Sequence, residues 1–352
     1  MSQSTPPPPP NAVTNVPPDH DWLALAEVEE AIDPDLPIVD THHHLGDRPG
    51  ARYLVPDLMR DIRDGHNIIA TVNVEGNHFF RTYGPPHLRT VGETEVLVSM
   101  TECREVGMTR VSAGIVGYAD FFLGAAVEEV LDAHIELGRG RFVGIRQITI
   151  WDESEAVRMY QFFPKRPLSA GMMADAKFRE GFATMAPRHL TFDATVFHTQ
   201  LGECLDLARA FPDTRMILDH LGCVVRVGPY AGKDDEIFRR WKTDLTRIAE
   251  LDNVYIKIGG LGMRMYGFDF RSRKAPPSST ELAELWKPFV ETAIEIFGPN
   301  RAMFESNFPI DKGYFGYRTC WNALKRLTRG ASENEKAALF ADTAIRTYGL
   351  AL

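Results

Sequence analysis

Eight short apolar runs recur along the chain after residue 36, separated by longer segments whose apolar residues repeat every three or four positions. The runs are typical of buried strands, and the segments are typical of helices with one apolar face. Strands that alternate with helices predict a parallel sheet, and eight of them predict a closed (β/α)8 barrel. The runs are IVDTHHHL, IIATVNVE, VSAGIVGYA, FVGIRQITI, LTFDATVFH, RMILDHLG, NVYIKIGGL and RAMFESNFP.

The alternative architecture is an open, doubly wound α/β sheet. It is disfavoured because no G-x-G-x-x-G motif follows the first apolar run and the sequence contains no P-loop. The segments with the clearest helical period are AAVEEVLDAHIELG, ECLDLARAFP, DEIFRRWKTDLTRIAEL and ELAELWKPFVETAIEIFG.

The first 35 residues differ from the rest of the chain. They include STPPPPPNAVTNVPPDHD, in which proline removes the backbone donors that a helix or a ladder needs. We therefore expect a proline-rich arm over residues 1–35, followed by one barrel domain over residues 36–352. A solvated tail and a strap on a partner subunit both remain open as roles for the arm.

Composition narrows the class of partner and the compartment. The net charge is −9 and no basic stripe stands out, which argues against nucleic acid as a partner. No apolar stretch reaches 18 residues, which argues against a membrane span. The four cysteines lie far apart without a C-x-x-C pair, which indicates free thiols in a reducing compartment, with the cytoplasm expected.

Polar residues that end the apolar runs are the candidates for a site, because a barrel carries its chemistry at the carboxyl ends of its strands. His42 and His44 share one face of an extended strand with Asp40, so the two imidazoles can converge on one ion or one ligand oxygen. Each candidate alone also fits a structural role, such as an ion pair, but burying them all on one rim without a ligand would be costly. The candidates are His42, His44, Glu75, Arg146, His198, His220, Lys257, Glu305 and Asn307.

Four motifs in this order resemble the amidohydrolase-related (amidohydrolase 2) family over roughly residues 36–350. They are D-x-H-x-H at residues 40–44, FHTQL, LDHLG and MFESNFPID. The resemblance implies a (β/α)8 barrel with a mononuclear metal site, a hydrolytic or decarboxylating reaction, and often a homodimer. It implies a divalent cation, with Zn²⁺ expected, bound by His42, His44 and His198.

The same resemblance assigns roles to the residues around the ion. It makes His220 the group that polarises substrate or steers water, and Arg146 a clamp for substrate carboxylate or carbonyl oxygens, since a guanidinium suits bidentate recognition. Lys257 is a further substrate-binding candidate. The rim is therefore expected to bind a small carboxylated or aromatic compound.

One motif departs from the family, whose last strand normally ends in S-D-x-P. Here the sequence reads Ser306-Asn307-Phe308-Pro309, and an amide cannot take up a proton at neutral pH. We therefore expect another carboxylate to be the base, with Glu75 (as base or metal ligand) ahead of Glu305. The departure also leaves open a metal-free site, in which the histidines and Arg146 bind substrate oxygens directly.

The leading hypothesis is a hydrolase in which metal-activated water attacks a lactone, ester or amide carbonyl. The first alternative is non-oxidative decarboxylation of an aromatic or muconate-type acid, which is disfavoured because Asn307 cannot supply the proton that this reaction needs. The second alternative is a barrel that binds a ligand without catalysis.

Overall fold

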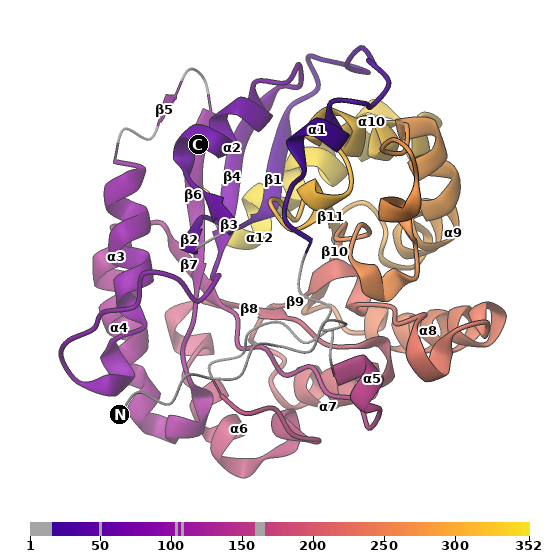
Figure 1. The fold of residues 1–352 in the computed structure, drawn as a ribbon. Helices are drawn as coiled ribbons and strands as arrows, with labels where there is room; N and C mark the ends of the chain where they lie inside the picture. Colours follow the sequence, from indigo (N-terminus) through magenta and orange to yellow (C-terminus); the bar gives the residue numbers. More distant parts are fainter. Residues whose placement is uncertain (1–15, 49–50, 103–104, 107–108, 159–165) are drawn as a thin grey trace, which may run out of the picture.

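The computed structural model describes residues 16–48, 51–102, 105–106, 109–158 and 166–352. Eight parallel strands form one barrel with helices around it (Figure 1). Seven of the eight strands fall within their predicted runs and β6 begins two residues before its run, so the prediction of a (β/α)8 barrel is confirmed. In order around the barrel, the strands are β1 (Ile38–His43), β4 (Ile68–Val74), β6 (Thr109–Gly117), β7 (Phe142–Ile145), β8 (Thr191–Ala194), β9 (Met216–Leu218), β10 (Val254–Ile258) and β11 (Ala302–Phe304).

Backbone hydrogen bonds beyond the end of β11 join the last strand to the first. The amide of Asn307 donates to the carbonyl of His42 at 2.9 Å, and the amide of His44 donates to the carbonyl of Phe308 at 2.8 Å. These bonds lay the segment after β11 along the end of β1. Residues that are more than 260 positions apart in the sequence therefore meet at one rim.

The helices cover the outside of the barrel, with α3 and α4 on one side and α8 and α9 on the opposite side (Figure 1). The four predicted helical segments form α4, α7, α8 and α9. The long helices are α2 (Val55–Ile62), α3 (Val91–Met100), α4 (Val127–Gly138), α6 (Ala176–Phe182), α7 (Leu201–Ala210), α8 (Asp234–Ala249), α9 (Ser279–Phe297) and α10 (Tyr317–Leu327). The shorter ones are α1 (His20–Leu23), α5 (Glu155–Arg158), α11 (Glu333–Ala337) and α12 (Thr343–Tyr348).

Three short strands were not predicted. β2 (Gly46–Arg48) and β3 (Ala51–Tyr53) form an antiparallel hairpin after β1, and β5 (Glu105–Val106) pairs antiparallel with β6. All three contain only two or three residues, which is too short to give a periodic pattern.

Residues 16–35 of the predicted arm lie against the barrel, whereas residues 1–15 lie outside the described part of the chain. The indole of Trp22 donates to the carbonyl of Arg273 at 3.1 Å. The carboxylate of Glu29 accepts from the amide of Ser279 at 2.6 Å and from the side chain of Asn322 at 3.0 Å. The described part of the arm is thereby held against the start of α9 and against α10.

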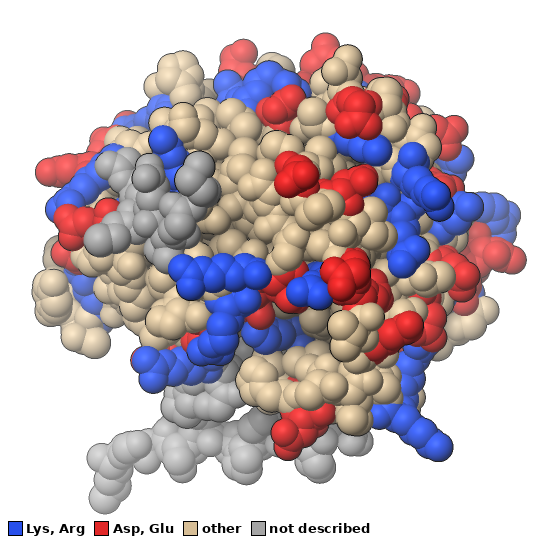
Figure 2. Space-filling model, turned by 90° about the horizontal axis from the view of Figure 1, so that it is seen from above, with Lys and Arg blue, Asp and Glu red and all other residues tan. Residues whose placement is uncertain are grey.

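The surface mixes acidic and basic side chains, and both kinds are scattered over the face shown in Figure 2. Within the described residues, no helix is both long and apolar enough to span a membrane. In the described part of the chain, the exposed large apolar side chains are Leu25, Val28, Tyr83, Ile135 and Leu352.

Candidate active site

His42 lies at the centre of a buried group of polar side chains inside the barrel. Its ring is fully buried, and its Nε2 atom lies 3.2 Å from Nε2 of the half-buried His44. The pairing of β1 with β4 shifts register between Asp40 and His43, which marks a local irregularity in β1. The expected convergence of His42 and His44 is thus observed in the short distance between their Nε2 atoms.

Asp40 does not share their face as the strict alternation of a strand had suggested. Its carboxylate accepts from the hydroxyl of Ser306 at 2.6 Å and from the hydroxyl of Tyr317, in α10, at 2.9 Å. The register shift after Asp40 breaks the two-residue period, so this carboxylate supports the junction of β1 and β11 from outside the barrel.

The hydrogen bonds of the two histidines indicate where each ring carries its proton. Nδ1 of His44 lies 2.8 Å from the carbonyl of Val74, which only a protonated Nδ1 can satisfy. Nε2 of His42 lies 3.3 Å from Nη1 of Arg146, which can only donate, and Nδ1 lies 3.0 Å from a carboxylate oxygen of Glu305, so we assign the ring proton to Nδ1. The ammonium of Lys257, 3.2 Å from the same Nδ1, then contacts the ring without a hydrogen bond. Burial lowers the pKa of His42 to about 4 and that of His44 well below its usual value. Two neutral imidazoles thus direct unprotonated Nε2 atoms at one another.

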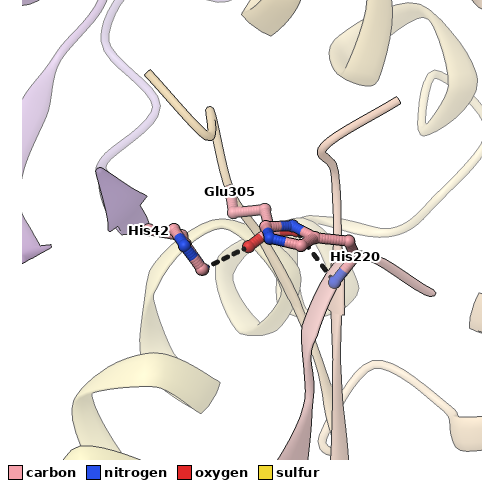
Figure 3. A group of neighbouring side chains, drawn as sticks. All are labelled: His42, His220 and Glu305. Carbon is pink, nitrogen blue, oxygen red and sulfur yellow. Dashed lines mark hydrogen bonds and ion pairs between the residues drawn. The ribbon is translucent and has the colours of Figure 1, made fainter. Parts of the chain in front are cut away.

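His220 and Glu305 form a second pair beside His42 (Figure 3). Nδ1 of His220 lies 2.6 Å from Oε1 of Glu305. Burial acts to lower the pKa of His220, but the Glu305 and Asp219 carboxylates together more than offset it and raise that pKa. Burial likewise acts to raise the pKa of Glu305, yet His220 and His42 lower it to about 2. Within the described residues His220 Nε2 has no hydrogen-bond partner, so it is available to water or substrate.

The backbone around His220 has an unusual local conformation. His220 has φ of 52°, in the left-handed region that non-glycine residues seldom adopt. Its ring packs directly on Gly260, where a Cβ atom would lie 2.5 Å from Nδ1 of His220. Gly260 itself has φ of 64°, so only glycine fits at this position without strain.

Arg146 reaches the same centre from β7, and Glu75 holds it there. Nε of Arg146 donates to Oε1 of Glu75 at 2.8 Å, and Nη2 donates to the backbone carbonyl of Glu75. These bonds leave Nη1 directed toward His42, 3.3 Å from its Nε2 atom. In this structure Glu75 therefore lies behind Arg146 and orients the guanidinium, while Arg146 itself faces the two histidines.

Lys257 is fully buried, and its ammonium contacts protein groups on several sides. Nζ lies 2.6 Å from Oδ2 of Asp193, 3.2 Å from Oδ1 of Asp219 and 3.2 Å from Nδ1 of His42. Burial acts to lower the pKa of Lys257, but the two aspartates raise it, so the ammonium stays charged. Asp193 and Asp219 were missed because they stand inside or directly after apolar runs. The signal that could have revealed them is a carboxylate inside an otherwise apolar run, since such a carboxylate must be buried and paired.

His198 lies apart from the His42 group. Its Nδ1 accepts from the amide of Val225 at 3.2 Å, and its ring makes an edge contact with Tyr230 at a centroid distance of 5.5 Å. Burial lowers its pKa to about 4. Among the described residues, the one group of three or more potential ligand residues with ligating atoms mutually within 4.8 Å is His42, His220 and Glu305.

Asn307 is held by a carboxylate that was also missed. Its side-chain amide donates to Oδ1 of Asp311 at 3.0 Å, and Oδ2 of Asp311 accepts from the amide of Gly262 at 2.9 Å. Burial raises the pKa of Asp311 to about 7. The amide that stands where the family has aspartate therefore has a buried carboxyl as its partner.

The donor atoms present fit a divalent cation best at the His42–His44 pair. Two nitrogen ligands of a tetrahedral zinc ion lie about 3.3 Å apart, given bonds of about 2.0 to 2.1 Å, and the observed Nε2 separation is 3.2 Å. In the group with His220, by contrast, the Glu305 oxygens are already engaged by the two histidines. The surrounding cluster also holds more carboxylates than permanent cations, which favours an added cation. The carboxylates are Glu75, Asp193, Asp219 and Glu305, and the cations are Arg146 and Lys257.

Comparison with known proteins places these motifs in context. A family model described as Amidohydrolase matches residues 39–350. The uncharacterized protein y4mH of Sinorhizobium fredii is 32% identical over 336 residues, which cover 89% of this chain and 99% of that protein. An L-fucono-1,5-lactonase of Burkholderia multivorans is 27% identical over 177 residues, which cover 50% of this chain and 57% of the lactonase.

The fold is also found in solved structures. The structure of an amidohydrolase from Burkholderia multivorans with bound zinc superposes with a TM-score of 0.67 at 23% sequence identity. The superposition covers 89% of this chain and 99% of that chain. At this level of identity the likeness supports the fold.

Proposed function

This chain belongs to the amidohydrolase family, and we propose that it is a lactonase-like hydrolase that opens a small lactone bearing a carboxylate or an aromatic group. The observation that carries the proposal is the His220–Glu305 pair, which lies beside the converging Nε2 atoms of His42 and His44. The lactonase relative supports the choice of a lactone over an ester or an amide.

We propose His220 as the general base. Its Nδ1–H is held by Glu305, which fixes the tautomer and leaves Nε2 to take a proton from the attacking water. The raised pKa of His220 makes the imidazole a stronger base than a free histidine, and the Glu305 carboxylate stabilises the imidazolium that forms. Glu305 itself, with its pKa lowered to about 2, is too weak a base for this step.

Arg146 is the proposed electrophilic group. Its Nη1 points into the space next to His42, where it can donate to the carbonyl oxygen of the lactone as negative charge develops there. Glu75 holds two other guanidinium nitrogens, so the direction of Nη1 is fixed before substrate binds. A substrate carboxylate would pair with the same guanidinium.

His42 and His44 are the proposed ligands of a divalent cation, with Zn²⁺ as the first choice. Such an ion would act as a Lewis acid and would lower the pKa of bound water. The zinc seen in the related amidohydrolase supports this choice. The ammonium of Lys257 would act through its positive charge beside His42, and it would not bind substrate directly because Asp193, Asp219 and His42 already surround it.

Metal analysis tests the ligand assignment, with a matched histidine as control. The zinc content and affinity of the purified protein are measured for His44→Asn and for His198→Asn. We expect His44→Asn to weaken zinc binding by at least about 100-fold and His198→Asn to change it little. Equal losses in both variants would restore His198 to the ligand set. Full activity after complete removal of metal by a chelator would overturn the role of the cation and favour direct binding of substrate by Arg146.

A substrate panel tests the reaction class. Lactones, esters, amides and hydroxybenzoates are offered to the same preparation, and ring opening, hydrolysis and carbon dioxide release are followed separately. Lactone opening is the expected result, and carbon dioxide release from an aromatic acid would replace it with decarboxylation. Tight binding without turnover would identify a binding protein.

We further propose that the protein is a cytoplasmic homodimer. Analytical ultracentrifugation of the purified protein measures the number of subunits.

A further inference from the structure

The end of the chain closes the floor of the barrel. After α11, one π-helical turn (Ala338–Asp342) leads into α12, which packs under the strands. Ala341, Ala344, Tyr348 and Leu350 belong to one core cluster with side chains from the barrel interior. The interior members are Val39, Ala70, Val72, Val74, Val116, Val143, Ile217 and Met303.

Tyr348 extends from this floor to the charged centre. Its hydroxyl donates to Oδ2 of Asp193 at 2.9 Å, and the same oxygen accepts from Nζ of Lys257 at 2.6 Å. Nζ of Lys257 also lies 5.6 Å from the centre of the Tyr348 ring. Nζ of Lys257 also lies 3.2 Å from Nδ1 of His42. A chain of contacts therefore runs from the C-terminal helix to the proposed cation ligand.

Each residue of this chain is buried. Asp193 and Lys257 are fully buried, and Tyr348 is 5% exposed. Loss of the Tyr348 hydroxyl would leave one donor on Oδ2 and would free the carboxylate to rotate toward Lys257. That movement would shift the ammonium relative to His42, whose Nδ1 lies between Lys257 and Glu305.

We propose that Tyr348 is a positioning residue of the active site: its hydroxyl fixes the Asp193–Lys257 ion pair under His42, so that the C-terminal helix sets the geometry of the rim above it. The kinetic part of this inference rests on the proposed hydrolase function. The structural part concerns only the environment of His42.

The chain contains a matched control with the same three residue types. The hydroxyl of Tyr53 donates to Oδ2 of Asp61 at 2.6 Å, and Lys312 reaches that carboxylate at 2.6 Å and 2.7 Å. Nζ of Lys312 lies 5.4 Å from the centre of the Tyr53 ring. This second set joins α2 to the segment before α10, and among the described residues it makes no contact with His42, so Tyr53→Phe removes an equivalent bond without touching that histidine.

The experiment compares Tyr348→Phe with Tyr53→Phe by kinetics and by NMR of ¹⁵N-labelled histidine. Tyr348→Phe is expected to lower kcat by about 10-fold, which a lost bond to a charged group can cause, with KM within about twofold, and to shift the ring ¹⁵N resonances of His42. Tyr53→Phe is expected to leave kcat and the His42 resonances unchanged at a similar cost in melting temperature. The NMR readout needs no substrate, so a shift in His42 without lactone turnover would refute the proposed function and uphold the positioning role.

Two outcomes overturn the inference. The first is unchanged His42 resonances in Tyr348→Phe, and the second is an equal loss of kcat in both tyrosine variants. Should Tyr348→Phe fail to fold, Asp193→Asn replaces it, because this substitution keeps the shape of the side chain and removes the Asp193–Lys257 ion pair that Tyr348 is proposed to fix. Unchanged His42 resonances in that variant would overturn the inference equally.

Discussion

The inside of the barrel has two halves that are equally buried and chemically opposite. The floor is filled by aliphatic side chains and by the C-terminal helix, whereas the rim holds a cluster of carboxylates, cations and histidines. At the end of β11 the change takes two residues, because Met303 lies in the floor and Glu305, just after the strand, lies in the rim. Strand periodicity points both side chains inward, so position along the strand alone separates a packing residue from a site residue.

The difference shows what each half contributes. Burying apolar surface in the floor stabilises the fold. Burying charge in the rim costs free energy, which contacts such as Lys257 with Asp193 and Arg146 with Glu75 offset in part. Changes in the rim should therefore alter activity most, and changes in the floor should alter stability most.

The largest expected effect is on activity, from breaking the pair His220–Glu305. Glu305→Gln should lower kcat/KM by about 10²- to 10⁴-fold, as for loss of general base catalysis. His220→Gln should do the same, and the double variant should lose little more, because the two residues act as a unit. Glu93→Gln is the control, since burial and then Glu75 raise the pKa of Glu93 to about 8 and its carboxyl is already neutral at pH 7. Fully additive losses in the double variant would contradict the dyad.

The floor should give the reverse result. Met303→Ala removes a fully buried side chain from the floor and should lower the free energy of unfolding by about 2 to 5 kcal/mol. Denaturant titration measures this change, and kcat measured per folded molecule should stay nearly constant. A large loss of kcat with unaltered stability would show that the floor and the rim are not separable in this way.

The pH dependence of stability should also distinguish the rim from the floor, because His42 in the rim has a shifted pKa. The unfolded chain protonates His42 near pH 6.5, whereas the folded chain does so only near pH 4. Between these values the unfolded state binds more protons, so the free energy of unfolding falls as the pH falls, by roughly 3 kcal/mol for this residue. Calorimetry across this range should show a shallower fall in His42→Asn, and an unchanged pH dependence in that variant would refute the neutral, buried state. Val72→Ala, in the floor, should instead lower stability equally at every pH.

The smallest expected effect is at Asn307. Asn307→Ala loses one hydrogen bond to Asp311 and places alanine at φ of 55°, which costs about 1 to 2 kcal/mol of stability; its activity should fall far less than that of Glu305→Gln. Asn307→Asp would set a carboxylate against the carboxyl of Asp311, so we expect no gain in kcat/KM. A rise of about a hundredfold in Asn307→Asp would instead identify a missing base, because that is the size of effect that a general base supplies.

The sequence predicted much of the site because strand ends are visible in the apolar pattern. His42, His44, Arg146 and His220 follow or end apolar runs, and the structure brings all four together. His198 was expected in the same group, but β8 ends at Ala194, so three loop residues separate the histidine from the strand, and its ring contacts Tyr230. The apolar run is longer than the strand, and a pattern of hydrophobicity does not show where pairing stops.

By itself, the sequence determined the barrel and the residue types on its rim, because apolar periodicity and burial are properties of each segment. Which side chains contact one another was decided only by the tertiary structure. The Glu305–His220 pair, the Asn307–Asp311 bond and the reach of Tyr348 to Asp193 each join residues whose distance depends on how the barrel closes and where each strand stops. The register shift in β1, which leaves Asp40 outside the barrel, likewise arises from pairing with β4.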